Sequence, residues 1–167
     1  MILQDFEEKT FKFSKWDNRG LLTAKMAASF SKDPSTKVGA ALFRPNKKIA
    51  GIGFNGFAPG INDYFIHDRN FKLNAIIHAE ENALDLCESC EGYSLYVWGL
   101  CICGRCTAKA ISKGVKKIIC VQEKERPDWE ESFKVSRAQA DMAKITLLVY
   151  KLEEIDPRLF IKFPVFE

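Results

Sequence analysis

Residues 93–121 read YSLYVWGLCICGRCTAKAISKGVKKIICV, and in them an apolar strand pattern is followed by a helical pattern and a second apolar strand pattern. The short apolar runs at 93–98 and 117–121 are rich in β-branched and aromatic residues, so each predicts a buried strand. Residues 103–113 between them predict a helix, which Gly114 closes just beyond its C-terminus. This order predicts two parallel strands joined by a crossover helix.

The flanking segments extend this pattern in both directions. Downstream, residues 129–144 predict a helix and residues 145–150 a further strand. Upstream, residues 37–43 and 48–54 predict two strands joined by a turn at 45–46, which makes this pair antiparallel. We therefore expect an α/β fold with a mixed five-stranded sheet that is covered by helices on both faces.

Two more helices are predicted before residue 93. Three apolar residues recur every four positions and therefore share one face of the first helix: Leu22, Met26 and Phe30. Asp17 or Asn18 is a suitable N-cap for that helix, because a short oxygen-bearing side chain accepts hydrogen bonds from free N–H groups. The second helix covers 75–87 and follows a connection at 55–74 that is rich in Gly, Asn and Asp. Connections of this length are usually functional or mobile.

Length and composition predict a single globular domain. The chain has 167 residues, of which 47% are hydrophobic and 28% are charged, and this balance excludes a disordered or fibrous protein. We expect one domain over residues 1–167, with a core from about 16 to 150 and a short C-terminal tail at 152–167.

Charge and the N-terminal residues argue against two further classes of protein. The 25 basic and 22 acidic residues give a net charge of +3, which is too small to indicate a nucleic-acid binder. No apolar run approaches the ~18 residues that span a bilayer. Residues 1–5 have neither the basic start nor the apolar core of a secretory signal, so we expect a cytoplasmic protein whose cysteines are reduced, buried or metal-bound.

Two short motifs carry the chemistry: His78-Ala79-Glu80 and Cys103-Gly104-Arg105-Cys106. Zinc binds imidazole nitrogen and thiolate sulfur in a tetrahedral shell, and two cysteines three positions apart at a helix start can contact one ion. His78, Cys103 and Cys106 would supply three protein ligands and leave the fourth position to water, which is typical of a catalytic site. Glu80 is then a carboxylate beside the metal that is free to move protons.

The remaining cysteines allow two alternative metal sites. The pair Cys87 and Cys90, together with the pair at 103–106, has nearly the spacing of a zinc ribbon, a binding module with a closed four-cysteine site. That alternative leaves the histidine and glutamate motif without a role. In the second alternative, Cys101 reaches the ion as a fourth ligand and excludes water. A spacing of two positions fits a helix start less well than a spacing of three.

Several motifs together resemble the deoxycytidylate deaminase family over residues 16–150, which is most of the chain. In chain order they are SKDPSTKVGA at 31–40, GFNG at 53–56, IHAEENA at 77–83, SLYV at 94–97 and the cysteine pair at 103–106. Zinc nucleobase deaminases share the signature His-x-Glu followed by Pro-Cys-x-x-Cys. Here Ile102 stands in place of that proline, which shapes the loop and is not a ligand. The resemblance implies a cytidine-deaminase-like three-layer α/β/α sandwich, in agreement with the predicted element order.

The resemblance also implies a reaction, the hydrolytic deamination of deoxycytidine monophosphate (dCMP) to deoxyuridine monophosphate (dUMP), which supplies thymidylate synthesis. Water activated by a single zinc ion attacks C4 of cytosine, and Glu80 carries protons to N3 and to the departing ammonia. Asn55 and the backbone at Ala79 are implied to contact the sugar or the base. Lys37 is a further candidate for binding the phosphate.

Regulation and assembly are implied as well. Many family members bind deoxycytidine triphosphate as an activator and thymidine triphosphate as an inhibitor, near a segment that corresponds here to Gly53 and Gly56. Arg69 and Lys72 are candidates for facing a phosphate or a neighbouring subunit, and a homo-oligomer, commonly a hexamer, is implied. Two related substrates stay open at this point, namely adenosine in tRNA and a 5-substituted dCMP.

Overall fold

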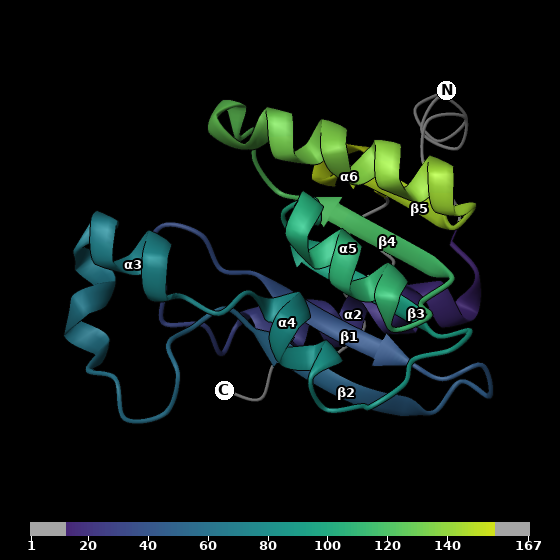
Figure 1. The fold of residues 1–167 in the computed structure, drawn as a ribbon, viewed down its shortest axis with the longest axis horizontal. Coiled ribbons are helices and arrows are strands. Elements are labelled where there is room, and N and C mark those ends of the chain that lie inside the picture. Colours follow the sequence, from purple (N-terminus) through teal and green to yellow (C-terminus); the bar gives the residue numbers. More distant parts are fainter. Residues whose placement is uncertain (1–12, 156–167) are drawn as a thin grey trace, which may run out of the picture.

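The computed structural model describes residues 13–155, which Figure 1 draws as a ribbon. Residues 1–12 and 156–167, which hold the expected non-signal N-terminus and most of the expected tail, lie outside the described residues. The strands are β1 (Gly39–Phe43), β2 (Ile49–Phe54), β3 (Ser94–Gly99), β4 (Lys117–Gln122) and β5 (Thr146–Lys151). The helices are α2 (Lys15–Ala28), α3 (Arg69–Ala75), α4 (Ala79–Leu84), α5 (Gly104–Ser112) and α6 (Glu130–Ala143). There are also short 3-10 helices, namely η1 (Asp63–His67), η2 (Pro127–Trp129) and η3 (Leu152–Glu154). Within residues 13–155, no helix is both long enough and apolar enough to cross a membrane.

The described strands form one mixed sheet in the order β2-β1-β3-β4-β5. Strand β1 pairs antiparallel with β2 and with β3, whereas β3, β4 and β5 run parallel. The parallel register places Val97 of β3 opposite Cys120 of β4. The predicted mixed sheet, with an antiparallel first pair and parallel later strands, is therefore confirmed.

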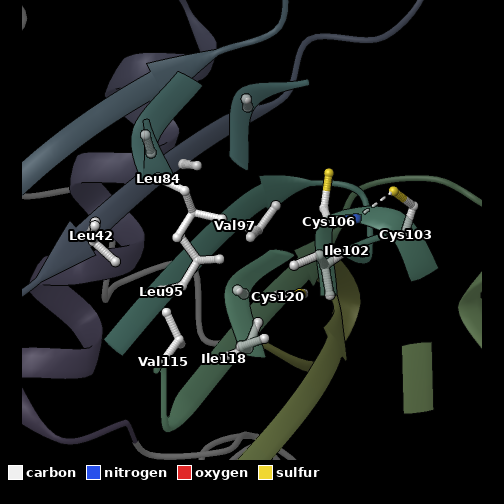
Figure 2. Packing of buried hydrophobic residues seen from close by; sticks show 14 of the residues in the cluster. Leu42, Leu84, Leu95, Val97, Ile102, Cys103, Cys106, Val115, Ile118 and Cys120 are labelled. Atoms are coloured by element: carbon white, nitrogen blue, oxygen red, sulfur yellow. Dashed lines mark hydrogen bonds between the residues drawn. The ribbon is translucent and has the colours of Figure 1, made fainter. Parts of the chain in front are cut away.

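Helices cover both faces of this sheet (Figure 1). Side chains alternate between the two faces along each strand, so each face has its own apolar cluster. On one face, α2 packs Leu21 and Ala24 against Tyr96 and Trp98. On the other face, α4, α5 and α6 cover the cluster of which Figure 2 shows a part: Leu42, Leu84, Leu95, Val97, Ile118 and Cys120. The predicted three-layer α/β/α sandwich is confirmed.

Helix α2 starts earlier than predicted. It begins at Lys15, and Ser14 is its N-cap because the Ser14 Oγ accepts a hydrogen bond from the Asp17 N–H at 3.1 Å. The expected caps, Asp17 and Asn18, were wrong because both residues lie inside the helix. The Asp17 carboxylate instead accepts a hydrogen bond from the Tyr96 hydroxyl at 2.8 Å, which ties α2 to the central strand β3.

The apolar residues that predicted helix α2 do not form its buried side, and Phe30 lies beyond the end of the helix at Ala28. Met26 and Phe30 are each 49% exposed. The side of α2 that faces the sheet consists mostly of small residues: Gly20, Leu21, Ala24, Ala27 and Ala28. A Cβ atom at Gly20 would lie only 2.3 Å from the Tyr96 ring. Close approach of helix and sheet therefore selects small residues for the buried side, and a search for large apolar residues misses it.

The connection after β2 contains structure that the sequence analysis placed elsewhere. Elements η1 and α3 lie within the expected loop and project beyond the sheet (Figure 1). The rings of Phe57 and Phe65 each pack against Phe71, with centroid distances of 5.6 and 4.7 Å. Gly56 and Ile77 then form an isolated antiparallel bridge at the base of the projection. Residue 77 is therefore extended, and the helix expected at 75–87 is present but shorter, since α4 covers only Ala79–Leu84.

Candidate active site

Two helix starts bring the predicted metal ligands together. His78 is the N-cap residue of α4, and Cys103 is the N-cap residue of α5. Cys106 lies in the first turn of α5, where its N–H donates to the Cys103 Sγ at 3.4 Å. The His78 Nδ1 lies 3.5 Å from the Cys103 Sγ and 3.4 Å from the Cys106 Sγ.

These three donor atoms fit a tetrahedral zinc ion. All of them lie within 4.8 Å of one another. With a Zn–S bond of about 2.3 Å and a Zn–N bond of about 2.0–2.1 Å, tetrahedral geometry separates sulfur from nitrogen by roughly 3.6 Å. The two sulfur–nitrogen distances here, 3.5 and 3.4 Å, are close to that value. One imidazole and two thiols are also the donor types that zinc prefers, so the residues present fit this ion.

The same contacts shift the protonation of the three ligands. The hydrogen bond with Cys103 raises the pKa of His78 to about 9. The contact with Cys106 and then that with His78 lower the pKa of Cys103 to about 4, whereas the Cys103 contact and burial raise the pKa of the Cys106 thiol. These contacts favour the charged forms of His78 and Cys103 and the neutral form of Cys106.

Glu80 lies in the first turn of α4, two positions after His78, and is 4% exposed. Burial raises the pKa of its carboxyl group to about 7. Glu80 and His78 line the same cavity. A carboxyl group with these properties can take up and release protons near neutral pH.

The other cysteines lie outside the donor group. Among residues 13–155, the group of metal-ligating side chains contains His78, Cys103 and Cys106 and excludes Cys101. The thiol of Cys101 is buried and donates to the Ile102 carbonyl at 3.6 Å. Cys87 and Cys90 are also absent from this group, and the Cys87 thiol donates to the Ala50 carbonyl of β2 at 3.9 Å. These contacts disfavour both alternative metal sites.

A cavity of about 320 Å³ opens beside the metal-ligating residues. Trp129 and Phe133 form part of its wall, and the Trp129 ring lies 5.8 Å from the His78 ring. Ala79 and Asn55, for which the family resemblance implies contact with the sugar or the base, also line it. A cavity of this size is within the range of small-molecule sites.

The Asn55 side chain is committed to holding the loop before β1. Its Oδ1 accepts from the Val38 N–H at 2.8 Å, and its Nδ2 donates to the Thr36 carbonyl at 2.9 Å. The amide also lies 3.4 Å from the Asp33 carboxylate. Asn55 thus shapes the cavity wall through residues 33–38, and its contact with a substrate stays a prediction.

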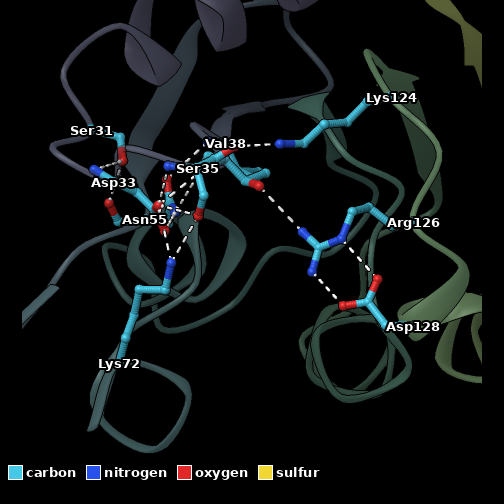
Figure 3. Close-up of polar contacts among 10 residues, drawn as sticks. Ser31, Asp33, Ser35, Val38, Asn55, Lys72, Lys124, Arg126 and Asp128 are labelled. Atoms are coloured by element: carbon cyan, nitrogen blue, oxygen red, sulfur yellow. Dashed lines mark hydrogen bonds and ion pairs between the residues drawn. The ribbon is translucent and has the colours of Figure 1, made fainter. Parts of the chain in front are cut away.

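Basic side chains line the same cavity, and Figure 3 shows the contacts of Lys72, Lys124 and Arg126. Lys72 of α3 contacts Asp33 at 3.2 Å and donates to the Ser35 Oγ at 2.9 Å. From the segment after β4, Lys124 donates to the Ser35 carbonyl and Arg126 pairs with Asp128. Four basic residues line the cavity, namely Arg69, Lys72, Lys124 and Arg126. They supply the positive charge that a phosphate group needs.

The structure separates the predicted substrate and effector residues into two groups. Arg69 and Lys72 line the cavity. Lys37 is exposed and does not line it. Gly53 and Gly56 do not line it either, and a Cβ at Gly53 would lie 2.2 Å from the Ala79 carbonyl of α4. Gly53 therefore allows β2 and α4 to pack closely, and effector binding near these glycines stays a prediction.

Sequence reasoning missed the cavity residues that follow β4. Lys124, Arg126, Asp128, Trp129 and Phe133 all line the cavity. In sheets with parallel strands, ligands bind beyond the carboxyl ends of the strands. The predicted parallel strand at 117–121 ends directly before these residues, so its carboxyl end was the signal that could have found them.

A three-layer α/β/α sandwich that gathers one histidine and two cysteines into one donor group, with a buried glutamate in the cavity beside it, defines the class of zinc nucleobase deaminases. The family model for the cytidine and deoxycytidylate deaminase zinc-binding region matches residues 14–122. The chain belongs to the cytidine and deoxycytidylate deaminase family, and it is a deaminase.

Relatives and solved structures agree with this assignment. The chain is 36% identical over 136 residues to an uncharacterized deaminase in the luxG 3′ region of Aliivibrio fischeri, with 79% of this chain and 91% of that protein covered. It is 31% identical over 148 residues to the deoxycytidylate deaminase of Pongo abelii, with 83% and 82% covered. The fold is similar to that of the dCMP deaminase from cyanophage S-TIM5 in complex with dCMP and dUMP. That similarity has a TM-score of 0.60 and 21% identity, and it covers 84% of this chain and 100% of that one.

Proposed function

We propose that this chain deaminates dCMP to dUMP. The observation that carries the proposal is that His78, Cys103 and Glu80 line the same cavity as four basic side chains, and that His78 and Cys103 form a donor group with Cys106. The metal-ligating residues and Glu80 are suited to the hydrolysis of an amino group on a nucleobase. The four basic side chains are suited to binding a phosphate. A nucleotide rather than a nucleoside is the substrate that uses both.

The metal-ligating residues would hold one zinc ion per chain. When bound, zinc lowers the pKa of a coordinated water toward ~7 and so supplies the nucleophile at neutral pH. Glu80 would take one proton from the attacking water and pass it to N3 of cytosine as the C4–O bond forms. It would then take the second proton from the new C4 hydroxyl and give it to the amino nitrogen, so that the C4–N bond breaks, the C4 carbonyl forms and ammonia leaves. The burial of Glu80 keeps bulk water from competing for these protons.

The charge around the cavity supports a monophosphate substrate. Asp33 and Asp128 offset part of the charge of the four basic residues, which leaves an excess of positive charge for a dianion. Charge-assisted hydrogen bonds to phosphate oxygens are roughly twice as strong as neutral ones. The deoxycytidylate deaminase of Pongo abelii and the dCMP-bound cyanophage structure support the same substrate. The product dUMP would supply thymidylate synthesis, whereas the homo-oligomer and the control by triphosphates stay predictions from family resemblance alone.

The decisive experiment compares dCMP with deoxycytidine by the loss of cytosine absorbance in the ultraviolet, with zinc-loaded protein. We expect turnover of dCMP and at least about 100-fold lower kcat/KM for deoxycytidine, which lacks the phosphate contacts. Arg126→Gln should remove most of that preference, because it removes a guanidinium from the cavity. Equal turnover of both substrates, or turnover of neither, would contradict the proposal.

A further inference from the structure

Asp128 stands between two arginines that come from different walls of the cavity. Its carboxylate accepts from Arg126 Nε at 2.9 Å and from Arg126 Nη2 at 2.7 Å, which is a bidentate pair (Figure 3). The Asp128 Oδ2 atom, which accepts from Arg126 Nη2, also lies 3.9 Å from Arg69 Nη2. Arg69 is the first residue of α3 in the projecting connection, and Arg126 follows β4. One carboxylate therefore gathers two guanidinium groups that are far apart in the sequence.

The bidentate pair fixes the direction in which Arg126 points. Asp128 occupies Nε and one hydrogen of Nη2, so the other Nη2 hydrogen and the Nη1 group stay available for other partners, and Nη1 donates to the Thr36 Oγ1 at 3.2 Å. Thr36 lines the cavity, as do Arg126 and Asp128. An arginine side chain loses up to about 2 kcal/mol of rotamer entropy when it is ordered, so an arginine that is already ordered binds its ligand more tightly.

Charge gives Asp128 a second effect on the same pair. Two guanidinium groups on facing walls repel each other unless an anion lies between them. The Arg126 hydrogen bond lowers the pKa of Asp128 to about 2, so the carboxylate is ionised at neutral pH. The arginines can then stay close together before a phosphate arrives.

Stability alone does not account for this arrangement. Arg126 is 20% exposed and Asp128 is 46% exposed at the side chain. Exposed ion pairs contribute at most about 1 kcal/mol to the free energy of unfolding. The pair is instead placed at a cavity, with good geometry, where its orienting effect acts on a ligand.

We propose that Asp128 is a positioning residue for the 5′-phosphate of the substrate, which acts by holding Arg126, and more weakly Arg69, in the orientation that presents positive charge to the cavity. This inference rests on the proposed function, because it assumes that a nucleoside monophosphate occupies the cavity. Asp128 itself, as an anion, makes no favourable contact with the phosphate.

A double-mutant cycle tests whether Asp128 acts through Arg126. The variants are Asp128→Asn, Arg126→Gln and the two combined, and the measured quantities are kcat and KM for dCMP. We expect Asp128→Asn to raise KM about tenfold with kcat changed less than about twofold, because only phosphate binding is affected. In the Arg126→Gln background, the same change should alter KM less than about twofold. Equal effects of Asp128→Asn in both backgrounds would overturn the inference.

Asp85→Asn is the matched control, because Asp85 forms an exposed ion pair with Lys109 at 2.7 Å and does not line the cavity. Two results together would indicate a structural role for Asp128 and contradict the inference. In the first, Asp128→Asn lowers kcat by the same factor by which it raises KM. In the second, Asp128→Asn lowers the melting temperature more than Asp85→Asn does.

The affinity for inorganic phosphate, measured by isothermal titration calorimetry, separates this inference from the proposed function. If the wild-type protein fails to deaminate dCMP, the proposed function is wrong. Weaker phosphate binding by Asp128→Asn than by Asp85→Asn would then still support the positioning role. Identical phosphate binding by the wild type, Asp128→Asn and Asp85→Asn would overturn it.

Discussion

The cavity has two sides that differ in almost every physical respect. On the metal side, Cys103, Cys106 and Glu80 are buried, and the ligands occupy two helix starts that short motifs encode. On the basic side, Arg69 is 75% exposed at its side chain, and Arg126 and Lys72 come from segments more than 50 positions apart. The metal side holds fixed groups close together, whereas the basic side assembles long side chains through ion pairs.

This difference teaches where each part of the function is encoded. A zinc site requires nitrogen and sulfur donor atoms at fixed distances from one another, and a helix start can place two such donors within four residues of sequence. Phosphate binding requires only positive charge and N–H donors, which many arrangements of Lys and Arg supply. The metal side therefore has a recognisable sequence pattern, and the basic side is specified only by the fold.

Removing a metal ligand should have the largest effect. Cys106→Ser replaces a thiolate that zinc prefers with a hydroxyl, so we expect loss of bound metal and loss of detectable deaminase activity. The measurements are metal content by elemental analysis and turnover of dCMP. Cys90→Ser is the matched control, because Cys90 is buried but lies outside the ligand group. Retention of zinc by Cys106→Ser, or its loss from Cys90→Ser alone, would contradict the ligand assignment.

Glu80→Gln should affect chemistry and leave metal binding intact. The amide has nearly the shape of the carboxyl group but cannot carry a proton, so we expect kcat to fall by about 10²–10⁴-fold. Zinc content should match that of the wild type, because Glu80 is outside the ligand group. Substrate affinity, measured by equilibrium binding of dCMP to this variant, should change little. Near-normal kcat would exclude Glu80 as the proton carrier.

The fold was predictable to the extent that large apolar runs and strand–helix alternation define it. Residues 93–121 contain β3, α5 and all of β4 except Gln122, and the parallel pairing of β3 with β4 follows from the alternation alone. The orientation of α2 was not predictable in this way, because its buried side is recognised by small size rather than by hydrophobicity. The elements η1 and α3 were missed because their packing depends on aromatic contacts inside a loop, such as Phe57 with Phe71.

The site was predictable on its metal side and much less so on its basic side. His78, Cys103, Cys106 and Glu80 come together where the sequence analysis expects them. Arg69 and Lys72 are brought to the cavity, but so are Lys124 and Arg126, which no sequence motif distinguishes from surface residues. Lys37 and Lys72 illustrate the reason, since only the path of the chain decides which of two lysines faces the cavity.

The smallest expected effect concerns the buried anchor of the basic side. The Asp33 carboxylate accepts from the Ser35 N–H at 2.9 Å, from the Ser35 hydroxyl at 2.8 Å and from the Thr36 N–H at 3.2 Å, and it pairs with Lys72. Burial disfavours its charged form, but the hydrogen bonds from Ser35 and Thr36 outweigh burial and lower the pKa of Asp33 below 3.8. We expect Asp33→Asn to lower the free energy of unfolding by about 1–3 kcal/mol at neutral pH, since a buried acceptor loses its charge and some of its hydrogen bonds.

The pH dependence of that loss has a definite sign. A carboxyl group with a lowered pKa in the folded protein stabilises the fold fully above its unfolded pKa, here 3.8, and this contribution disappears as the pH falls through the folded value. The difference in unfolding free energy between the wild type and Asp33→Asn should therefore be constant near neutral pH and shrink below about pH 4, as measured by urea denaturation. Lys72→Met sharpens the test, because it leaves the hydrogen bonds from Ser35 and Thr36 to Asp33 in place. The unfolding free energy of Lys72→Met should therefore keep most of the pH dependence that Asp33 gives to the wild type. If Lys72→Met removes all of it, the lysine rather than the loop N–H groups holds the carboxylate, and the basic side depends on its ion pairs even at its buried anchor.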